Sequence, residues 1–267
     1  MKKSSSGSKP SAMSSKSRSS RSAGRPIGDR LARVPFGLVI VAMVFPTAAA
    51  WLYFVRLDGS EWARNAYVVG KVIQFSLPLL AVETWRLPAL SVVLERLSLR
   101  RREALKWTAV STVSAAAISI LYSVVLRDSG LAAEAPQRIA PKLDDFGVVN
   151  PASYVLLALF LSFVHSFLEE YYFRWFIFGA LRRRTSLSAA YALSSMAFMA
   201  HHVIVIATYL GSEEIPLIVL LSLGVTAGGL FWAWLYERTG SLLAPWLSHV
   251  VGDLAIMGIG YDLAGPT

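Results

Sequence analysis

The chain has 267 residues and is too apolar for an ordinary soluble domain, because 55% of its residues are hydrophobic, 16% are charged and its mean hydropathy is +0.51. Its formal charge of +9 comes almost entirely from residues 1–34, which hold nine Lys and Arg against one Asp and no aromatic residue for base stacking, so nucleic-acid binding is not expected. The sequence contains no Cys, which excludes thiolate metal sites, disulfides and thiol nucleophiles.

The amino-terminal segment, residues 1–34, is rich in Ser, Lys, Arg and Gly. Such a composition cannot bury enough apolar surface to fold, so we predict a disordered basic tail. The tail is either a solvated segment whose charge sets the membrane topology or an arm that binds anionic lipid headgroups. A cleavable signal peptide is not expected, because the apolar segment that follows is long and has no small-residue cleavage site.

The next region, residues 35–150, is predicted to form amino-terminal transmembrane helices. Three apolar stretches have membrane-spanning length: Pro35–Val55, Tyr67–Trp85 and Trp107–Leu126. Between the last two, Arg86–Lys106 is rich in Arg and has apolar residues at helical spacing, which predicts a helix along the cytoplasmic interface. Arg127–Asn150 has two Pro and no periodicity, so we expect a loop.

The last region, residues 151–267, is predicted to be a catalytic transmembrane core. It has four apolar stretches of spanning length: Pro151–Arg184, Ser188–Leu210, Pro216–Tyr236 and Leu242–Tyr261. The whole chain is therefore predicted to be an all-α, polytopic bundle with seven spans. An eighth span would require one of these segments to be divided, and Leu87–Leu99 is the favoured place for it.

Charge predicts the orientation of the spans. Basic connectors alternate with acidic ones along the chain, which matches the positive-inside rule. We therefore expect a multi-pass protein of the plasma (inner) membrane whose amino terminus is cytoplasmic and whose carboxyl terminus is outside. Trp232, Trp234 and Tyr236 lie near the cytoplasmic end of their span and are typical of an interfacial aromatic belt.

The stretch Pro151–Arg184 carries three charged residues at membrane depth, Glu169, Glu170 and Arg174. Each charge at the centre of a bilayer costs about 2.5 to 3.5 kcal/mol, so these side chains should face protein or water. Glu170 and Arg174 are four residues apart and can neutralise each other. Glu169 points about 100° away from Glu170 on the same helix, so it is left as a candidate general base or ligand.

Two further polar groups lie at comparable depth in other spans. One is Phe198 with His202 four residues later, preceded by His201, and the other is His249 with Asp253 four residues later. Taken singly, each has a structural alternative: a hydrogen-bonded packing histidine, a buried ion pair or an aspartate facing a polar cavity. Their combined insertion cost favours a functional site formed from all of them.

These groups resemble the three motifs of the CAAX prenyl protease and bacteriocin-processing family, the CPBP or Abi intramembrane endopeptidases. The motif EExxxR is present as Glu169 to Arg174, FxxxH as Phe198 to His202, and HxxxN or HxxxD as His249 to Asp253. They occur in the expected order with one motif in each helix. The resemblance covers Pro151–Asp253, and the tail and first three spans carry no family signal.

The resemblance implies a role for each motif residue. Glu169 would be the catalytic carboxylate and would act with His202 to bind and deprotonate a water molecule. His249 and Asp253 would orient the scissile carbonyl and stabilise the oxyanion. The pair Glu170 and Arg174 would support the helix and tune Glu169.

Three other residues are expected to surround these groups without a required direct role: His165, His201 and Phe198. His165 lies four residues before Glu169 on the same helical face and is the strongest of them for a direct role. No metal is assigned, because the HExxH pattern of many zinc proteases is absent and Glu169 would have to be both ligand and base. The alternative is Zn²⁺ held by His202, His249 and Glu169 with one open position.

The function predicted from these residues is an intramembrane endopeptidase, a CAAX protease-like hydrolase reached from the cytoplasmic side. Its partners would be membrane lipids and a peptide or protein substrate, with a lipidated or hydrophobic carboxyl terminus as one form of that substrate. One alternative is a non-enzymatic membrane immunity or scaffold protein that keeps the family fold. A proton-coupled transporter is disfavoured because the sequence has no internal repeat or paired broken helices.

Overall fold

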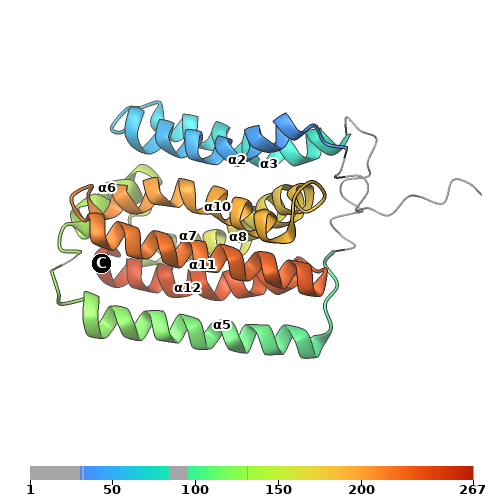
Figure 1. The fold of residues 1–267 in the computed structure, drawn as a ribbon. Coiled ribbons are helices and arrows are strands. Elements are labelled where there is room, and N and C mark those ends of the chain that lie inside the picture. Colours follow the sequence, from blue (N-terminus) through green and yellow to red (C-terminus); the bar gives the residue numbers. More distant parts are fainter. Residues whose placement is uncertain (1–30, 32, 84–95, 131, 267) are drawn as a thin grey trace, which may run out of the picture.

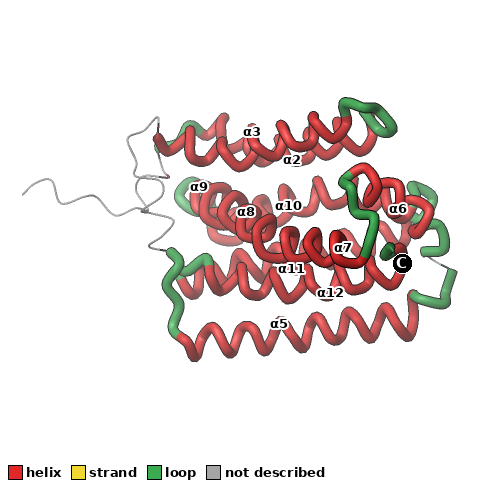
Figure 2. The backbone as a smooth tube through the Cα atoms, turned by 180° about the vertical axis from the view of Figure 1, so that it is seen from behind, coloured by secondary structure: helices red, strands yellow, loops and turns green. Residues whose placement is uncertain are grey.

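The computed structural model describes residues 31, 33–83, 96–130 and 132–266, and all regular structure in this part of the chain is helical. The long helices lie side by side in one bundle (Figures 1 and 2). The α-helices are α2 (Phe36–Trp51), α3 (Ala63–Glu83), α5 (Arg101–Leu121), α6 (Ala135–Asp145), α7 (Pro151–Leu159), α8 (Ser166–Glu169), α9 (Gly179–Leu181), α10 (Leu187–Leu210), α11 (Ile215–Thr239) and α12 (Leu243–Ala264). The predicted all-α class is confirmed.

Four π-helical segments extend or join these helices: Leu52–Arg56 after α2, Tyr122–Leu126 after α5, and Phe160–His165 and Glu170–Phe178 between α7 and α9. With them, six continuous helices are long and apolar enough to cross a membrane. Seven spans were predicted. The difference is α3, which corresponds to the predicted span Tyr67–Trp85 and ends where the described residues stop at Glu83.

The central helix runs without a break from Pro151 to Leu181 and is called the rod below. It starts at a capping box, in which Asn150 Oδ1 accepts from the Ser153 amide and Ser153 Oγ accepts from the Asn150 amide. Pro151 occupies the first helical position, where no amide hydrogen is needed. Two of the predicted functional residues, Glu169 and Glu170, lie where the rod changes from α8 to the π-helical segment Glu170–Phe178. Such π-helical geometry is frequent at functional sites.

Two predictions about connectors were wrong. The expected loop Arg127–Asn150 contains α6, because Pro136 lies in the first helical turn and the helix is anchored by ion pairs from Lys142 to Asp58 and from Arg138 to Glu213. Arg101 to Lys106 belong to the membrane-length helix α5 and not to an interfacial helix. Residues 96–100 of that predicted helix form a turn and a stretch without regular secondary structure, and residues 86–95, with most of the possible eighth span, lie outside the described residues.

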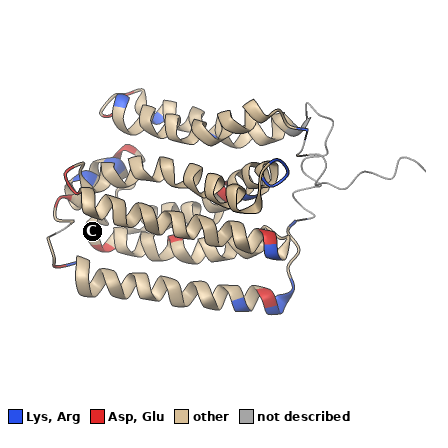
Figure 3. Ribbon diagram, in the orientation of Figure 1, with Lys and Arg blue, Asp and Glu red and all other residues tan. Residues whose placement is uncertain are grey.

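The bundle has two distinct ends, and most charged residues gather there (Figure 3). The arginine end carries the first turn of α5, the Arg182–Arg184 turn and the end of α11, where Arg182 pairs with Glu237 at 3.1 Å. The α6 end carries α6, the α2–α3 and α10–α11 connectors and the end of α12, where Asp262 pairs with Arg127 at 2.9 Å. Every long helix runs from one end to the other.

The predicted tail lies outside the described residues except for its last positions, among which Leu31 and Val34 are buried. Their carbonyl oxygens accept hydrogen bonds from the Arg184 guanidinium. The chain that leads into α2 is thus fixed to the arginine end of the rod.

Candidate active site

Side chains from α2, α3, the rod, α10 and α12 line a cavity of about 280 Å³ inside the bundle. This volume has room for several water molecules, each of which takes about 30 Å³ in the liquid. The charged residues and histidines in its wall include all four predicted catalytic residues. The full set of these side chains is Lys71, His165, Glu169, His201, His202, His249 and Asp253. The structure therefore brings Glu169, His202, His249 and Asp253 to one site.

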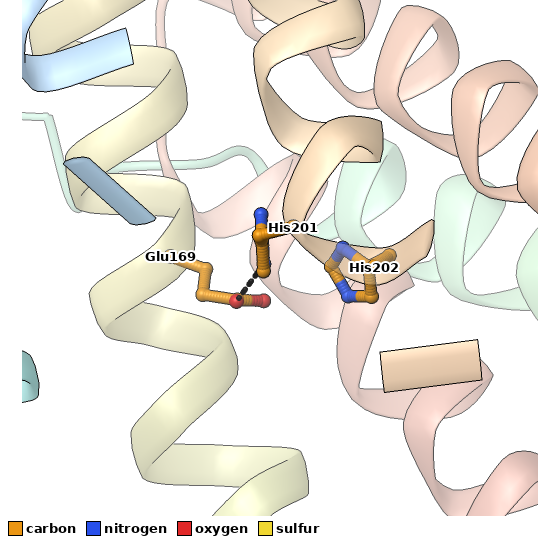
Figure 4. A group of neighbouring side chains, drawn as sticks. All are labelled: Glu169, His201 and His202. Atoms are coloured by element: carbon orange, nitrogen blue, oxygen red, sulfur yellow. Dashed lines mark ion pairs between the residues drawn. The ribbon is translucent and has the colours of Figure 1, made fainter. Parts of the chain in front are cut away.

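Glu169 is the centre of the polar wall and is 5% exposed. Its Oε1 lies 3.4 Å from His201 Nε2 and 3.9 Å from His165 Nε2, and its Oε2 lies 3.8 Å from His249 Nε2. Figure 4 shows the carboxylate directed toward the paired histidines of α10. Three imidazoles from three helices thus surround the carboxylate that the sequence left without a partner.

His249 is held in a fixed orientation by the neighbouring Glu170. Its Nδ1 lies 2.9 Å from Glu170 Oε1, and because a carboxylate only accepts, Nδ1 carries the proton. The other nitrogen, Nε2, therefore faces Asp253 Oδ1 at 3.4 Å and the cavity. Such a carboxylate–histidine contact sets both the tautomer and the ring orientation.

Trp232 packs against this histidine, with the two rings stacked at a centroid distance of 3.9 Å. The indole Nε1 donates to Ser248 Oγ at 2.9 Å, and Ser248 is also bonded to Ser111 of α5. The prediction of an interfacial role for Trp232 was wrong, because a tryptophan near a helix end can turn inward when a buried acceptor is available.

Glu170 and Arg174 form a buried ion pair, with Arg174 Nε 3.2 Å from Glu170 Oε2 and both residues almost fully inaccessible. The guanidinium also lies over the rings of Phe198 and Trp232, at 4.5 and 5.2 Å from their centroids. Glu170 therefore joins Arg174 to His249, a link that the spacing of the motifs alone did not predict.

The two histidines of α10 differ in their contacts. His201 is the one whose Nε2 approaches Glu169, although the sequence favoured His202 for the direct role. His202 Nδ1 donates to the Phe198 carbonyl oxygen at 2.9 Å, so the Nε2 of its neutral ring is free to accept. Phe198 packs against the rings of both histidines, which gives the FxxxH spacing a structural role.

The donor set can be tested against a metal ion. Glu169, His201 and His202 each offer a ligand atom, and these atoms lie within 4.8 Å of one another. The 3.4 Å between His201 Nε2 and Glu169 Oε1 is the spacing expected for two ligands of one zinc ion bound at about 2.0 to 2.2 Å. The residues fit a metal, but the compact set contains His201 in place of the predicted His249, whose Nδ1 is engaged by Glu170.

Sequence reasoning missed the contribution of α3. Lys71 lines the cavity, with its Nζ 5.6 Å from the ring centroids of Tyr67 and Phe75. Tyr67 and Tyr209 complete the aromatic part of the wall. A lysine inside an apolar span was visible in the sequence and is itself a sign of a functional position.

Residues 151–255 match the family model described as type II CAAX prenyl endopeptidase Rce1-like. The matched segment runs from the start of the rod into α12 and contains all three motifs, whereas α2, α3 and α5 lie before it. No curated protein and no solved structure matches the chain.

Proposed function

We propose that this multi-pass membrane protein, whose residues 151–255 match the family model described as type II CAAX prenyl endopeptidase Rce1-like, is an endopeptidase that hydrolyses peptide bonds with a water molecule activated by Glu169. The observation that carries the proposal is the Glu169 carboxylate in the cavity wall, surrounded by imidazoles from three helices. The substrate is a peptide or protein segment, with a lipidated or hydrophobic carboxyl terminus as one form.

In the first step, Glu169 and the histidines of α10 position the water molecule that attacks the substrate. A water molecule in the cavity donates one hydrogen bond to Glu169 and the other to the free Nε2 of His202. Glu169 takes a proton as the water oxygen attacks the carbonyl carbon of the substrate. His201, 3.4 Å from the carboxylate, keeps Glu169 directed toward the cavity.

The second step needs donors for the developing oxyanion. His249 is suited to this role when both of its ring nitrogens are protonated, because Nδ1–H then donates to Glu170 while Nε2–H, which faces the cavity beside Asp253, donates to the oxyanion. Collapse of the tetrahedral intermediate breaks the C–N bond. The proton held by Glu169 then passes to the leaving amine, which restores the carboxylate.

A divalent metal held by Glu169, His201 and His202 would supply Lewis-acid polarisation of the same water. The role of His249 toward the oxyanion would be unchanged, because it lies outside that ligand set. Exhaustive dialysis against a chelator therefore distinguishes the metal-free mechanism from the metal-dependent one. A metal-independent enzyme keeps its activity after dialysis, whereas a metal-dependent enzyme loses its activity and regains it on addition of Zn²⁺.

The experiment compares new peptide termini in membranes that contain the wild-type chain, Glu169→Gln or Glu61→Gln. Glu61 is an exposed carboxylate in the α2–α3 connector and serves as the matched control. The proposal expects termini that depend on Glu169 and are unaffected by Glu61→Gln. If all three samples give the same termini while the proteins accumulate equally, the non-enzymatic scaffold role replaces the endopeptidase.

A further inference from the structure

The cavity extends from Glu169 in one direction only, toward the α6 end. On α10 the lining residues continue past His202 to Val205 and Tyr209, one residue before the helix ends at Leu210. On α12 they continue past Asp253 to Ile256 and Met257, in the half of the helix that ends beside α6. Both helices start at the arginine end, so their lining residues lead away from it.

The other walls of the cavity show the same direction. On α2 and its π-helical extension the lining residues run from Pro46 to Phe54, close to the α2–α3 connector. Tyr67 and Lys71 lie in the first turns of α3, directly after that connector. On the rod, Leu161 and His165 precede Glu169 and so lie on its α6 side.

The opposite direction is closed by packed side chains. Every residue of the rod from Glu169 to Phe178 is buried, and this stretch includes five of the largest side chains of the core: Tyr172, Phe173, Trp175, Phe176 and Phe178. Leu31, Val34, Val39 and Ala42 pack on them from the start of the chain and from α2. Among the described residues, no rod position after Glu169 lines the cavity, so this core separates the cavity from the arginine end.

Charge assigns the two ends to the two sides of the membrane. At the α6 end, the described connectors and helix ends carry nine acids against five bases; the bases are Arg56, Arg64, Arg127, Arg138 and Lys142. At the arginine end, ten Lys and Arg stand against Glu83, Glu103 and Glu237; the bases are Arg33, Arg96, Arg100, Arg101, Arg102, Lys106, Arg182, Arg183, Arg184 and Arg238. The positive-inside rule therefore places the arginine end in the cytoplasm and the α6 end outside.

We propose that the active site opens to the extracytoplasmic side and that its substrate is an apolar polypeptide segment presented at the outer face of the membrane. This inference rests on the proposed function only in calling the bound segment a substrate. It replaces the cytoplasmic access expected from the sequence. The entrance walls suit such a segment, since Phe54, Val205, Ile256 and Met257 offer apolar contacts. Lys71 is the one Lys or Arg among the described residues that line this cavity, and it offers a partner for a substrate carboxylate.

The chain contains no Cys, so single-cysteine variants test this proposal without background labelling. Val205→Cys and Met257→Cys place a thiol in the cavity on two helices. Ser212→Cys marks the α6 end, and Arg183→Cys marks the arginine end; both are exposed. Each variant is treated with a membrane-impermeant sulfonate thiol reagent, first in spheroplasts and then in inside-out vesicles.

In spheroplasts we expect labelling of Val205→Cys, Met257→Cys and Ser212→Cys, and protection of Arg183→Cys. Cavity thiols labelled only in inside-out vesicles together with Arg183→Cys would overturn the proposal. So would protection of both cavity thiols from both sides while the two markers react, because the cavity would then not be reached by water. The readout needs no proteolysis, so it can fail while the endopeptidase stands, and it can succeed in a protein that cuts nothing.

Discussion

The two halves of the rod have almost opposite surroundings although they belong to one continuous helix. In the half toward the α6 end, large apolar side chains such as Val155, Leu156 and Phe160 are exposed on the bundle surface. In the half toward the arginine end, every residue from Glu169 to Phe178 is buried among α2, α3, α10 and α11. The candidate site lies where these two surroundings meet.

This comparison shows how the fold can hold charged groups inside a membrane. The packed half supplies a rigid support in which Arg174 neutralises Glu170 and Glu170 fixes His249. The more open half supplies the cavity that Glu169 lines, while the ion pair of Glu170 and Arg174 stays buried in the packed half. Substitutions in the packed half should therefore change stability, and substitutions at the cavity wall should change activity.

The largest expected effect is on activity and comes from the cavity wall. Glu169→Gln keeps the size of the side chain but cannot accept the proton of water, so we expect the initial rate of peptide cleavage to fall by about 10² to 10⁴-fold. The rate is measured with purified protein in proteoliposomes. A Glu169→Gln variant that cleaves at the wild-type rate would contradict the assignment of the general base.

The largest expected effect on stability comes from the packed half. Arg174→Met leaves Glu170 as a buried carboxylate without its cation, which should cost about 3 to 5 kcal/mol. Thermal unfolding in detergent, followed by tryptophan fluorescence, measures the change. The double variant Glu170→Gln with Arg174→Met should lose less than the sum of the two single variants, and strict additivity would show that the two residues do not interact.

A smaller difference is expected between two tyrosines. Tyr172 in the packed half donates to the Ala42 carbonyl oxygen at 2.7 Å, so Tyr172→Phe should lower the free energy of unfolding by about 0.5 to 1.5 kcal/mol. Tyr209→Phe at the cavity wall should leave it nearly unchanged. Chemical denaturation of both variants checks the contrast, and equal losses would remove the distinction between the two halves.

The smallest effect is expected at the exposed connector of the α6 end. A hydrogen bond from its own backbone N–H and the nearby Arg138 guanidinium lower the pKa of Glu213 below its ordinary value of 4.5. The charged form is favoured in the folded protein, so this stabilisation is present above pH 4.5 and is lost as the pH falls through the folded pKa. Glu213→Gln should lower the melting temperature slightly at pH 7 and leave it unchanged at pH 2. A difference that persists at pH 2 would contradict this origin.

Much of this arrangement followed from local sequence features. The apolar stretches predicted the membrane helices, and the motif spacing predicted which helices carry polar groups. The rotation of each helix was not predictable, because packing against neighbours decides it. His201 and His202 point about 100° apart, and only the contact of α10 with the rod selects His201 to face Glu169.

Other features depend on contacts between distant residues. Trp232 looked interfacial until Ser248 of the next helix provided an acceptor for its indole. The helix α6 was missed because its ion pairs join it to Asp58 and Glu213, which are far away in the sequence. The direction of the cavity depends on which half of the rod the other helices fill, and no local pattern contains that information.

The most direct measurement of the central claim is the fate of solvent oxygen. Cleavage of a substrate in water enriched in ¹⁸O, followed by mass spectrometry of the products, shows whether the new carboxyl oxygen comes from water. The account predicts one ¹⁸O atom in the newly formed carboxyl terminus with the wild-type chain, and about 10² to 10⁴-fold less labelled product with Glu169→Gln. A labelled product that forms equally with Glu169→Gln, or a new carboxyl terminus without ¹⁸O, would contradict it.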